Sequence, residues 1–322
     1  MQPAADTPPT ALRDENPLPC DAIVEFDEPR HLYHAIDSDG CRVRMRTSVT
    51  KVIERWCAQF NAKDVIAKNL PKWRCEDAKG VYNTLLEMLV HVEGYCEEAA
   101  CERIAKMWEL RGERARDAGT AMHLDFESIL NGAPPPQGET PEVRRFRRWL
   151  AQFCESHGLV PFRTELRVAD VEAGVAGSID FLLVDCRGPQ FGAAIVDFKR
   201  VNGKKRKLGD ERQFEPKNCK GPMACLPDTS TGHYTAQLNL YWAMVNNELS
   251  DPPPPCLGLY LAQFYEDDAV NCFAVPTDAS LAERLLAEER RSQEAARQAA
   301  ALEKRPDAPP PRQTASAGDN EA

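Results

Sequence analysis

The segment AAIVDFKRV, at residues 193–201, begins as an apolar run and then carries Asp197 and Lys199. The composition predicts a β-strand, in which successive side chains point to opposite faces of the sheet. One face of this strand would carry Ala193, Ile195, Asp197 and Lys199. The apolar members of that row indicate a face turned toward the protein interior, where charges are costly unless they are paired or used. Asp197 and Lys199 are therefore candidates for a functional site.

A second carboxylate, Asp180, lies on the preceding predicted strand, GVAGSIDFLLVD. The short turn CRGPQFG between the two segments predicts that the strands are antiparallel neighbours. Asp180, Asp197 and Lys199 would then converge beside a backbone carbonyl, that of Phe198. Hard oxygen ligands of this kind suit Mg²⁺ or Mn²⁺. Lys199 could hold, or help to deprotonate, a water molecule that attacks a phosphorus atom.

Two predicted helices carry further polar pairs. In GTAMHLDFE, His123 and Glu127 are four residues apart and share one helix face, where they could complete or position the metal shell. In QLNLY, Gln237 and Tyr241 have the same spacing on a later helix. Taken alone, each pair has a simpler interpretation as a solvated or half-buried helix face.

In chain order these motifs resemble the PD-(D/E)XK nuclease superfamily, specifically its RecB-like exonuclease branch. That family has H-x3-E on a helix, G-x-x-D on a strand, (D/E)-x-K on the next strand and Q-x3-Y on a later helix. The matching residues here are His123 and Glu127, Gly177 and Asp180, Asp197 and Lys199, and Gln237 and Tyr241. Glu165 of TELRV also resembles the family, and the resemblance covers about 30–276.

The resemblance implies metal-dependent hydrolysis of DNA phosphodiester bonds, with Mg²⁺ or Mn²⁺ as the cofactor and DNA as the partner. It favours an exonuclease over an endonuclease, acting in replication, recombination or repair. It assigns catalytic roles to Glu127, Asp180, Asp197, Lys199, Gln237 and Tyr241, and metal ligation to His123, Asp180, Asp197 and the carbonyl of Phe198. The segment HLYHAIDSDGCRVRMRTSVTKVIE resembles the leader of members from large DNA viruses and eukaryotes.

No single motif carries this interpretation. A D-x-K triplet is expected about once by chance in a chain of this size, and Asp77 to Lys79 is a second copy in a polar segment. The interpretation depends on four weak motifs occurring in the required order on the predicted element types. Two alternatives remain: a catalytically inactive nucleic-acid-binding module of the same fold, and a scaffold whose charged pairs are incidental salt bridges.

The spacing of apolar residues along the chain predicts the helices and strands that position these residues. The folded region is predicted to be an α/β (α+β) domain with a restriction-endonuclease-like core, in which a central mixed β-sheet is flanked by helices. An N-terminal helical extension is predicted to precede the sheet. The predicted parts are a disordered N-terminus at 1–20, the domain at 21–277 with its helical part at about 48–157 and its sheet at about 160–277, a helix at 278–303 and a disordered tail at 304–322.

Charge is distributed unevenly along the chain. The net charge of −10 argues against a basic surface overall, yet 199–220 contains nine Lys or Arg and three Asp or Glu. Its KKRK run at 204–207 could contact DNA phosphates or act as a nuclear localisation signal. A separate cluster, Arg144, Arg145, Arg147 and Arg148, is expected to form one exposed helix face.

The twelve cysteines include no C-x2-C pair, which excludes zinc-ribbon spacing. Cys256 and Cys272 are the two that follow the Gln237–Tyr241 segment, so we expect no iron–sulfur cluster of the kind that some RecB-like relatives carry. The chain has no apolar run long enough for a membrane span and no secretory signal. We therefore expect no membrane partner and an intracellular protein, nuclear or cytoplasmic; the sequence does not distinguish a cellular from a viral origin.

Overall fold

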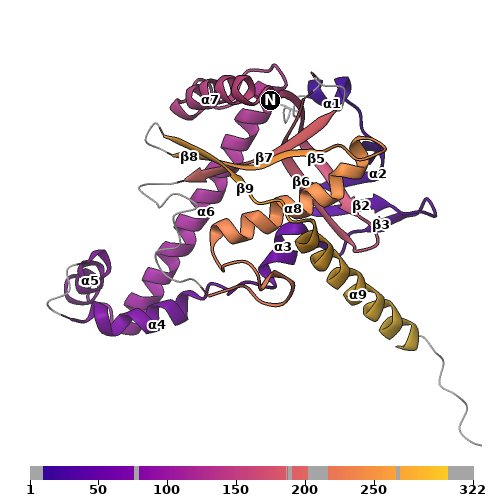
Figure 1. Ribbon diagram of the computed structural model, residues 1–322. Coiled ribbons are helices and arrows are strands. Elements are labelled where there is room, and N and C mark those ends of the chain that lie inside the picture. The colour runs from indigo at the N-terminus through magenta and orange to yellow at the C-terminus, as the bar shows by residue number, and fades with distance from the viewer. Residues whose placement is uncertain are drawn as a thin grey trace, which may run out of the picture.

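A six-stranded mixed β-sheet lies at the centre of the fold (Figure 1). The computed structural model describes residues 10–75, 80–185, 187, 191–201, 217–265 and 269–303. The strands of this sheet are β4 (Thr47–Ser48), β5 (Val160–Asp170), β6 (Val175–Asp185), β7 (Gly192–Val201), β8 (Cys256–Tyr265) and β9 (Val270–Val275). Their order is β4-β6-β7-β8-β9, with β5 also paired to β6. The predicted α+β class, a mixed sheet flanked by helices, is confirmed.

Strand β6 changes partner along one of its edges. Strand β5 pairs antiparallel with β6 along one edge from Val175 to Val184. Along the other edge, β7 pairs antiparallel with the end of β6, from Phe181 to Asp185, whereas β4 pairs in parallel with Val175 and Ala176. The residues between these two stretches, 177–180, pair with neither strand on that edge. The sheet therefore opens at Asp180, as β6 and β7 diverge.

A second, three-stranded antiparallel sheet precedes the central one. Its strands are β1 (Val24–Asp27), β2 (Leu32–Ile36) and β3 (Arg42–Arg44). The helices are α1 (Ala11–Glu15), α2 (Cys20–Ile23), α3 (Val49–Glu54), α4 (Ala62–Trp73), α5 (Val81–Glu87), α6 (Glu97–Leu130), α7 (Pro141–His157), α8 (Ser230–Leu249) and α9 (Ala279–Glu303). A π-helix, η1 (Met88–Val92), follows α5, and a 3-10 helix, η3 (Gly221–Met223), precedes α8.

Apolar residues cover both faces of the central sheet. On one face, Ala193 and Ile195 of β7 join a buried cluster with residues of α3, α8 and α9. On the other face, Ala194, Val196 and Phe198 join a cluster with aromatic residues of α6 and α7. Both sides of β7 are thus buried, which explains its nearly continuous apolar sequence.

The helical extension has a small core of its own. Helices α4 and α5 lie at the end of α6 farthest from the sheet (Figure 1). Ile66, Leu86, Leu89 and Ile104 form its buried centre, with Trp73, Tyr82 and Trp108 packed around them. The long helix α6 therefore connects this extension to the sheet and carries His123 at the sheet end.

One predicted boundary is wrong. Residues 10–20 are not disordered: the backbone N–H of Leu12 donates to Asn131 Oδ1 at 2.9 Å, and Asn16 Nδ2 donates to the carbonyl of Phe162 at 3.2 Å. Helix α9 lies where a helix was predicted, at 278–303, and its Leu281 and Leu285 are fully buried in the main core. Composition identified both segments as polar but did not reveal the few residues that anchor them.

The arginine cluster of α7 also differs from the prediction. Arg144, Arg147 and Arg148 are exposed, but Arg145 is 4 % exposed and lies on the same face as the buried Phe146 and Trp149. The helical phase turns this one arginine inward, so the cluster is not a single exposed face. Among the described residues no helix is both long enough and apolar enough to cross a membrane.

A buried arginine anchors the N-terminal segment. The side chain of Arg163 on β5 is 2 % exposed and donates to Asp21 Oδ2 at 2.7 Å and to Asp21 Oδ1 at 2.5 Å. Burial opposes ionisation of Asp21, but the hydrogen bonds from Arg163 outweigh it and lower the pKa of this carboxyl below its usual value. The pair therefore stabilises the fold at neutral pH and loses this contribution in acid.

We expect Asp21→Ala to lower the free energy of unfolding by about 3 kcal/mol at pH 7, because it leaves the buried guanidinium of Arg163 unpaired. The difference from wild type should shrink below about pH 4, where the unfolded carboxyl is protonated. Urea denaturation at several pH values measures both effects. Glu25→Ala, which removes an exposed partner of Arg42, is the control and should change stability little. Equal losses in the two variants would contradict the anchoring role.

Candidate metal and catalytic site

The divergence of β6 and β7 brings together the acidic residues predicted from the sequence. Phe181 pairs with Val196, and beyond this pair Asp180 reaches across the opening to accept a hydrogen bond from the backbone N–H of Phe198 at 2.8 Å. The Asp180 carboxylate thus replaces the backbone carbonyl that would accept this N–H in a regular pair of strands. Asp197, next to this N–H, is 2 % exposed. Both predicted carboxylates therefore lie at one point of the sheet.

Three residues present ligand atoms to a common point: His123, Glu165 and Asp180, with one such atom from each within 4.8 Å of the others. His123 Nδ1 lies 3.6 Å from Asp180 Oδ2 and 4.0 Å from Glu165 Oε1. Its Nε2 lies 3.0 Å from the carbonyl oxygen of Phe198. Helix α6 and strands β5 and β6 each contribute one residue to this group, and the Phe198 carbonyl of β7 lies against the other ring nitrogen of His123.

Glu165 was not among the predicted metal ligands. In β5, Thr164 pairs with Phe181 and Leu166 pairs with Ile179, so Glu165 lies opposite Asp180. Its backbone φ of 44° is in the left-handed region, which is uncommon for a residue with a side chain and clusters at functional sites. Ser178 Oγ donates to its Oε2 at 2.8 Å and fixes the carboxylate. The signal in the sequence was its place in TELRV, on the strand before Asp180.

Asp197 faces a different set of partners. Its Oδ2 lies 2.5 Å from Lys199 Nζ, and its Oδ1 accepts a hydrogen bond from Gln237 Nε2 at 2.9 Å. Lys199 Nζ also lies 4.7 Å from the centre of the Tyr234 ring, a cation–π contact that the sequence did not suggest. Helix α8 covers the sheet face on which Asp197 and Lys199 were predicted to lie. Its Gln237 and Tyr234 therefore orient these two charged side chains.

Tyr241 of α8 lies against the opening in the sheet and is buried. A Cβ atom on Gly177 would come within 2.6 Å of Tyr241 Cε1, so the glycine leaves room for the ring. This contact gives a steric reason for the glycine three residues before Asp180. Gln237, one helical turn earlier, supports Asp197, so both residues of the Q-x3-Y motif reach the site.

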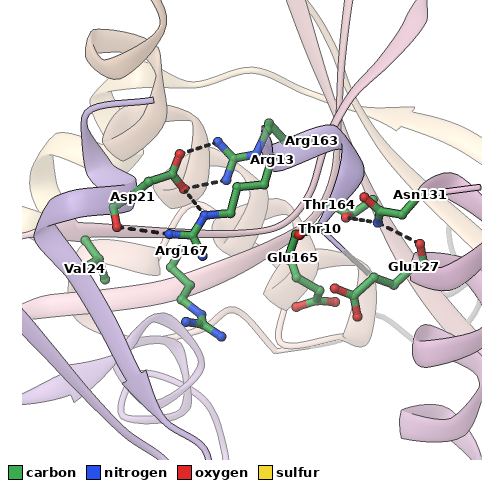
Figure 2. Close-up of a pocket in the computed structure, with 10 residues that line it drawn as sticks. All are labelled: Thr10, Arg13, Asp21, Val24, Glu127, Asn131, Arg163, Thr164, Glu165 and Arg167. Atoms are coloured by element: carbon green, nitrogen blue, oxygen red, sulfur yellow. Dashed lines mark hydrogen bonds and ion pairs between the residues drawn. The ribbon is translucent and has the colours of Figure 1, made fainter. Parts of the chain in front are cut away.

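Glu127 lies beside the three-residue group and lines a cavity of about 190 Å³ (Figure 2). Its carboxylate and that of Glu165 point toward one another. The cavity is lined by Thr10, Arg13, Asp21, Val24, Glu127, Asn131, Arg163, Thr164, Glu165 and Arg167. Burial, reinforced by the charge of Glu165, raises the pKa of Glu127 to about 7. Glu127 is thus a neighbour of the ligand group and not a member of it.

The electrostatics indicate a site with more negative charge than its surroundings stabilise. Burial raises the pKa of Asp180 and, with the charge of Asp180, raises that of Asp197 to about 6 despite Lys199. Burial disfavours an imidazolium at His123, but Asp180 and Glu165 outweigh it and raise its pKa to about 9. Burial also opposes the charge of Lys199, whose pKa is nevertheless raised by Asp197 and Asp180. An added cation would satisfy these carboxylates.

The donor set fits a hard divalent cation. Carboxylates of Glu165 and Asp180 and the imidazole of His123 offer mainly oxygen, as Mg²⁺ and Mn²⁺ prefer. The carbonyl of Phe198, which was predicted as a further ligand, faces the other ring nitrogen of His123, Nε2. The buried Oδ2 of Asp197 accepts no hydrogen bond of good geometry from the described part of the chain, although the Lys199 ammonium lies against it. Acidic and histidine groups that can hold a metal ion are therefore present where the sequence predicted them.

Two other predicted features cannot be placed. The KKRK run at 204–207, with most of the basic segment, lies outside the described residues. The second D-x-K triplet, at 77–79, lies outside them as well.

Comparisons with known proteins add no assignment. No protein-family model and no curated protein sequence matches this chain. A solved structure titled "Crystal structure of SSO0001" is similar over 77 % of this chain and 76 % of its own, at 13 % identity and a TM-score of 0.26. A similarity at that score supports no conclusion about fold or function.

We expect Asp180→Asn and Glu165→Gln each to reduce Mn²⁺ affinity by about 10-fold or more, because each removes an anionic ligand with little change in shape. Calorimetric titration of the purified protein without nucleic acid measures the affinity. Asp185→Asn is the matched control, since Asp185 is on the same strand but pairs with Arg187. Loss of affinity in Asp185→Asn, or none in Asp180→Asn, would place the ion elsewhere.

Proposed function

We propose that this protein is a metal-dependent nuclease that hydrolyses DNA phosphodiester bonds, as its resemblance to the RecB-like branch of the PD-(D/E)XK superfamily implies. The observation that supports the proposal best is the position of Lys199. Its ammonium lies at the edge of the carboxylate group, 2.5 Å from Asp197 Oδ2. A charged lysine that is held beside a candidate cation site is suited to a reaction, whereas an incidental salt bridge has no need of the adjacent ligand group.

His123, Glu165 and Asp180 would hold Mg²⁺ or Mn²⁺, with Asp197 and the Phe198 carbonyl next to them. When bound, such an ion polarises a phosphate oxygen and lowers the pKa of water. Because the pKa of Lys199 is raised, the side chain remains an ammonium. Lys199 would therefore orient the attacking water or stabilise phosphate charge, instead of removing a proton as a neutral amine. Gln237 and Tyr234 hold Asp197 and Lys199 in position for this role.

DNA as substrate, and an exonuclease in preference to an endonuclease, follow from the resemblance and not from a described contact. The basic segment 199–220 supports a nucleic-acid substrate through its charge. The same proposal places the protein in the nucleus or cytoplasm, of a host cell or of a cell infected by a virus. The second candidate function, a catalytically inactive DNA-binding module, is disfavoured because Asp180, Asp197 and Lys199 are all present and in contact with the site.

We expect Asp197→Asn and Lys199→Gln each to lower the hydrolysis rate by at least about 100-fold, the scale typical of losing one positioned catalytic group. Circular dichroism and thermal melting should show that both variants remain folded. Hydrolysis of a fluorescent oligonucleotide under excess Mg²⁺ measures the rate.

Asp77→Ala and Lys79→Ala are the sequence-matched controls, because they alter a second D-x-K triplet that no predicted strand precedes. Both should retain activity. If the changes at 77 and 79 abolished hydrolysis while those at 197 and 199 did not, the assignment of the site would be wrong.

End-labelled linear DNA, single- and double-stranded, and closed circular DNA should each be incubated with Mg²⁺, Mn²⁺ or Ca²⁺. We expect degradation of linear DNA with Mg²⁺ or Mn²⁺, little cutting of closed circles, and none with Ca²⁺, which activates water poorly. Equal rates on circles would make the protein an endonuclease. Tight DNA binding without cleavage of DNA or RNA under any metal would favour the inactive module.

A further inference from the structure

Four side chains with metal-binding atoms meet at a second place, remote in sequence from the acidic group. They are Cys57, Cys219, Asp228 and His233, and one ligand atom from each lies within 4.8 Å of all the others. Both cysteines are buried, and Asp228 and His233 are half-buried. These residues have no recognisable spacing in the sequence, because Cys57 and Cys219 are 162 positions apart.

Backbone contacts between separate segments position these four residues. Cys57 follows α3, and the N–H of Lys220 donates to the carbonyl of Trp56 at 2.8 Å. Cys219 lies next to the isolated bridge between Asn218 and Pro227, and its N–H donates to the carbonyl of Leu226 at 2.9 Å. His233 is in the first turn of α8, just after Asp228. The end of α3, the segment 217–229 and the start of α8 thus converge.

The atoms are spaced as tetrahedral ligands would be. The two sulfur atoms are 4.0 Å apart. With zinc–sulfur bonds of about 2.3 Å, the edge of a tetrahedron between two sulfurs is about 3.8 Å. The same separation is far longer than a disulfide bond, which is about 2.05 Å. His233 Nε2 and Asp228 Oδ1, now hydrogen-bonded at 2.7 Å, would need to separate slightly to admit an ion.

Contacts of the same residues already hold two of these groups in place. Asp228 Oδ2 accepts a hydrogen bond from the backbone N–H of Ala58 at 2.9 Å, which fixes the carboxylate next to Cys57. Besides each other, the thiols contact carbonyls, Cys57 that of Ile53 at 3.2 Å and Cys219 that of Pro227 at 3.6 Å. Two thiols, an imidazole and an oriented carboxylate are thus together, and within the described part of the chain neither sulfur has a strong partner.

We propose that Cys57, Cys219, Asp228 and His233 bind a structural zinc ion. Two thiolates and one imidazole are usual zinc ligands, and the carboxylate completes four-coordination without leaving a position for water. Binding would release one proton from each thiol. The competing explanation, two buried thiols beside a separate histidine–aspartate ion pair, accounts for each pair but not for the convergence of all four ligand atoms.

The proposed ion would support the catalytic face of α8. His233 is adjacent to Tyr234, whose ring lies over Lys199, and one turn precedes Gln237, which bonds to Asp197. A zinc ion at this point would fasten the start of α8 to the end of α3. This role is independent of what the acidic site binds.

Full-length protein purified without chelators should contain about one zinc ion per chain by mass spectrometry of metals. Replacement by Co²⁺ should give an absorption band from thiolate-to-cobalt charge transfer. Cys57→Ser and His233→Gln should each lose the zinc and weaken or abolish that band; His233→Gln is included because it leaves both buried thiols intact. Thermal melting of the same samples reports whether each variant is folded.

Three controls separate this site from others. Cys225→Ser changes an exposed thiol of the same loop, and Cys20→Ser changes a buried thiol elsewhere; both should keep the zinc. Asp180→Asn should also keep it, since that variant alters the acidic site alone. Absence of zinc together with no cobalt–thiolate band, full zinc retention in Cys57→Ser and His233→Gln, a Cys57–Cys219 disulfide, or iron and sulfide in place of zinc would each overturn the proposal.

Discussion

The divergence of β6 from β7 is the constraint on which the rest of the site depends. A strand has two edges, and β5 occupies one edge of β6 along almost its full length. The other edge is shared by β7 and β4, which leaves 177–180 without a backbone partner on that side. Side chains must then bond to the backbone N–H and C=O groups that have no partner in the neighbouring strand. Asp180 does so by accepting the N–H of Phe198, and this bond places a carboxylate at the heart of the sheet.

Neighbouring side chains offset the free-energy cost of burying these carboxylates. Buried carboxylates are unfavourable without positive charge or hydrogen-bond donors. Lys199 supplies charge to Asp197, Gln237 supplies a donor, and the imidazole of His123 approaches Asp180 from α6. The surrounding aromatic residues exclude water on the α6 and α7 side, which strengthens every charge interaction inside. The carboxylates that lie where β6 and β7 diverge are therefore also the groups that could bind a cation.

Much of this arrangement could be predicted because it depends on the regular repeat of side-chain direction along a strand or a helix. Alternation along β7 put Asp197 and Lys199 on one face, where an ion pair joins them. Helical spacing put Gln237 and Tyr241 on one face of α8, and it paired His123 with Glu127, of which His123 alone joins the ligand group. What the period could not show is how far each side chain reaches. Glu127 and Glu165 were both visible in the sequence, but only Glu165 joins the ligand group, because register and a left-handed φ aim it at Asp180. Tyr234 was missed, since a ring above an ammonium has no sequence signature.

The N-terminal segment shows a further limit of composition. Proline-rich, polar sequence led to the expectation of disorder up to residue 20, yet Leu12 and Asn16 bond to residues more than a hundred positions away. These are single hydrogen bonds and one buried ion pair, and no run of apolar residues announces them. The ion pair depends on a partner of Asp21, Arg163, which lies buried on β5.

Because Thr10, Arg13, Asp21 and Val24 form part of the wall around Glu127 and Glu165, the beginning of the chain is also part of the architecture near the ligand group. A shortened protein that starts at residue 21 would keep every motif residue but lose Thr10 and Arg13 from that wall. Solvent would then reach the two facing glutamates more freely, and the charge environment of Glu165 would change. The first residue of an expressed domain thus determines how well the charges of Glu127 and Glu165 are shielded from solvent.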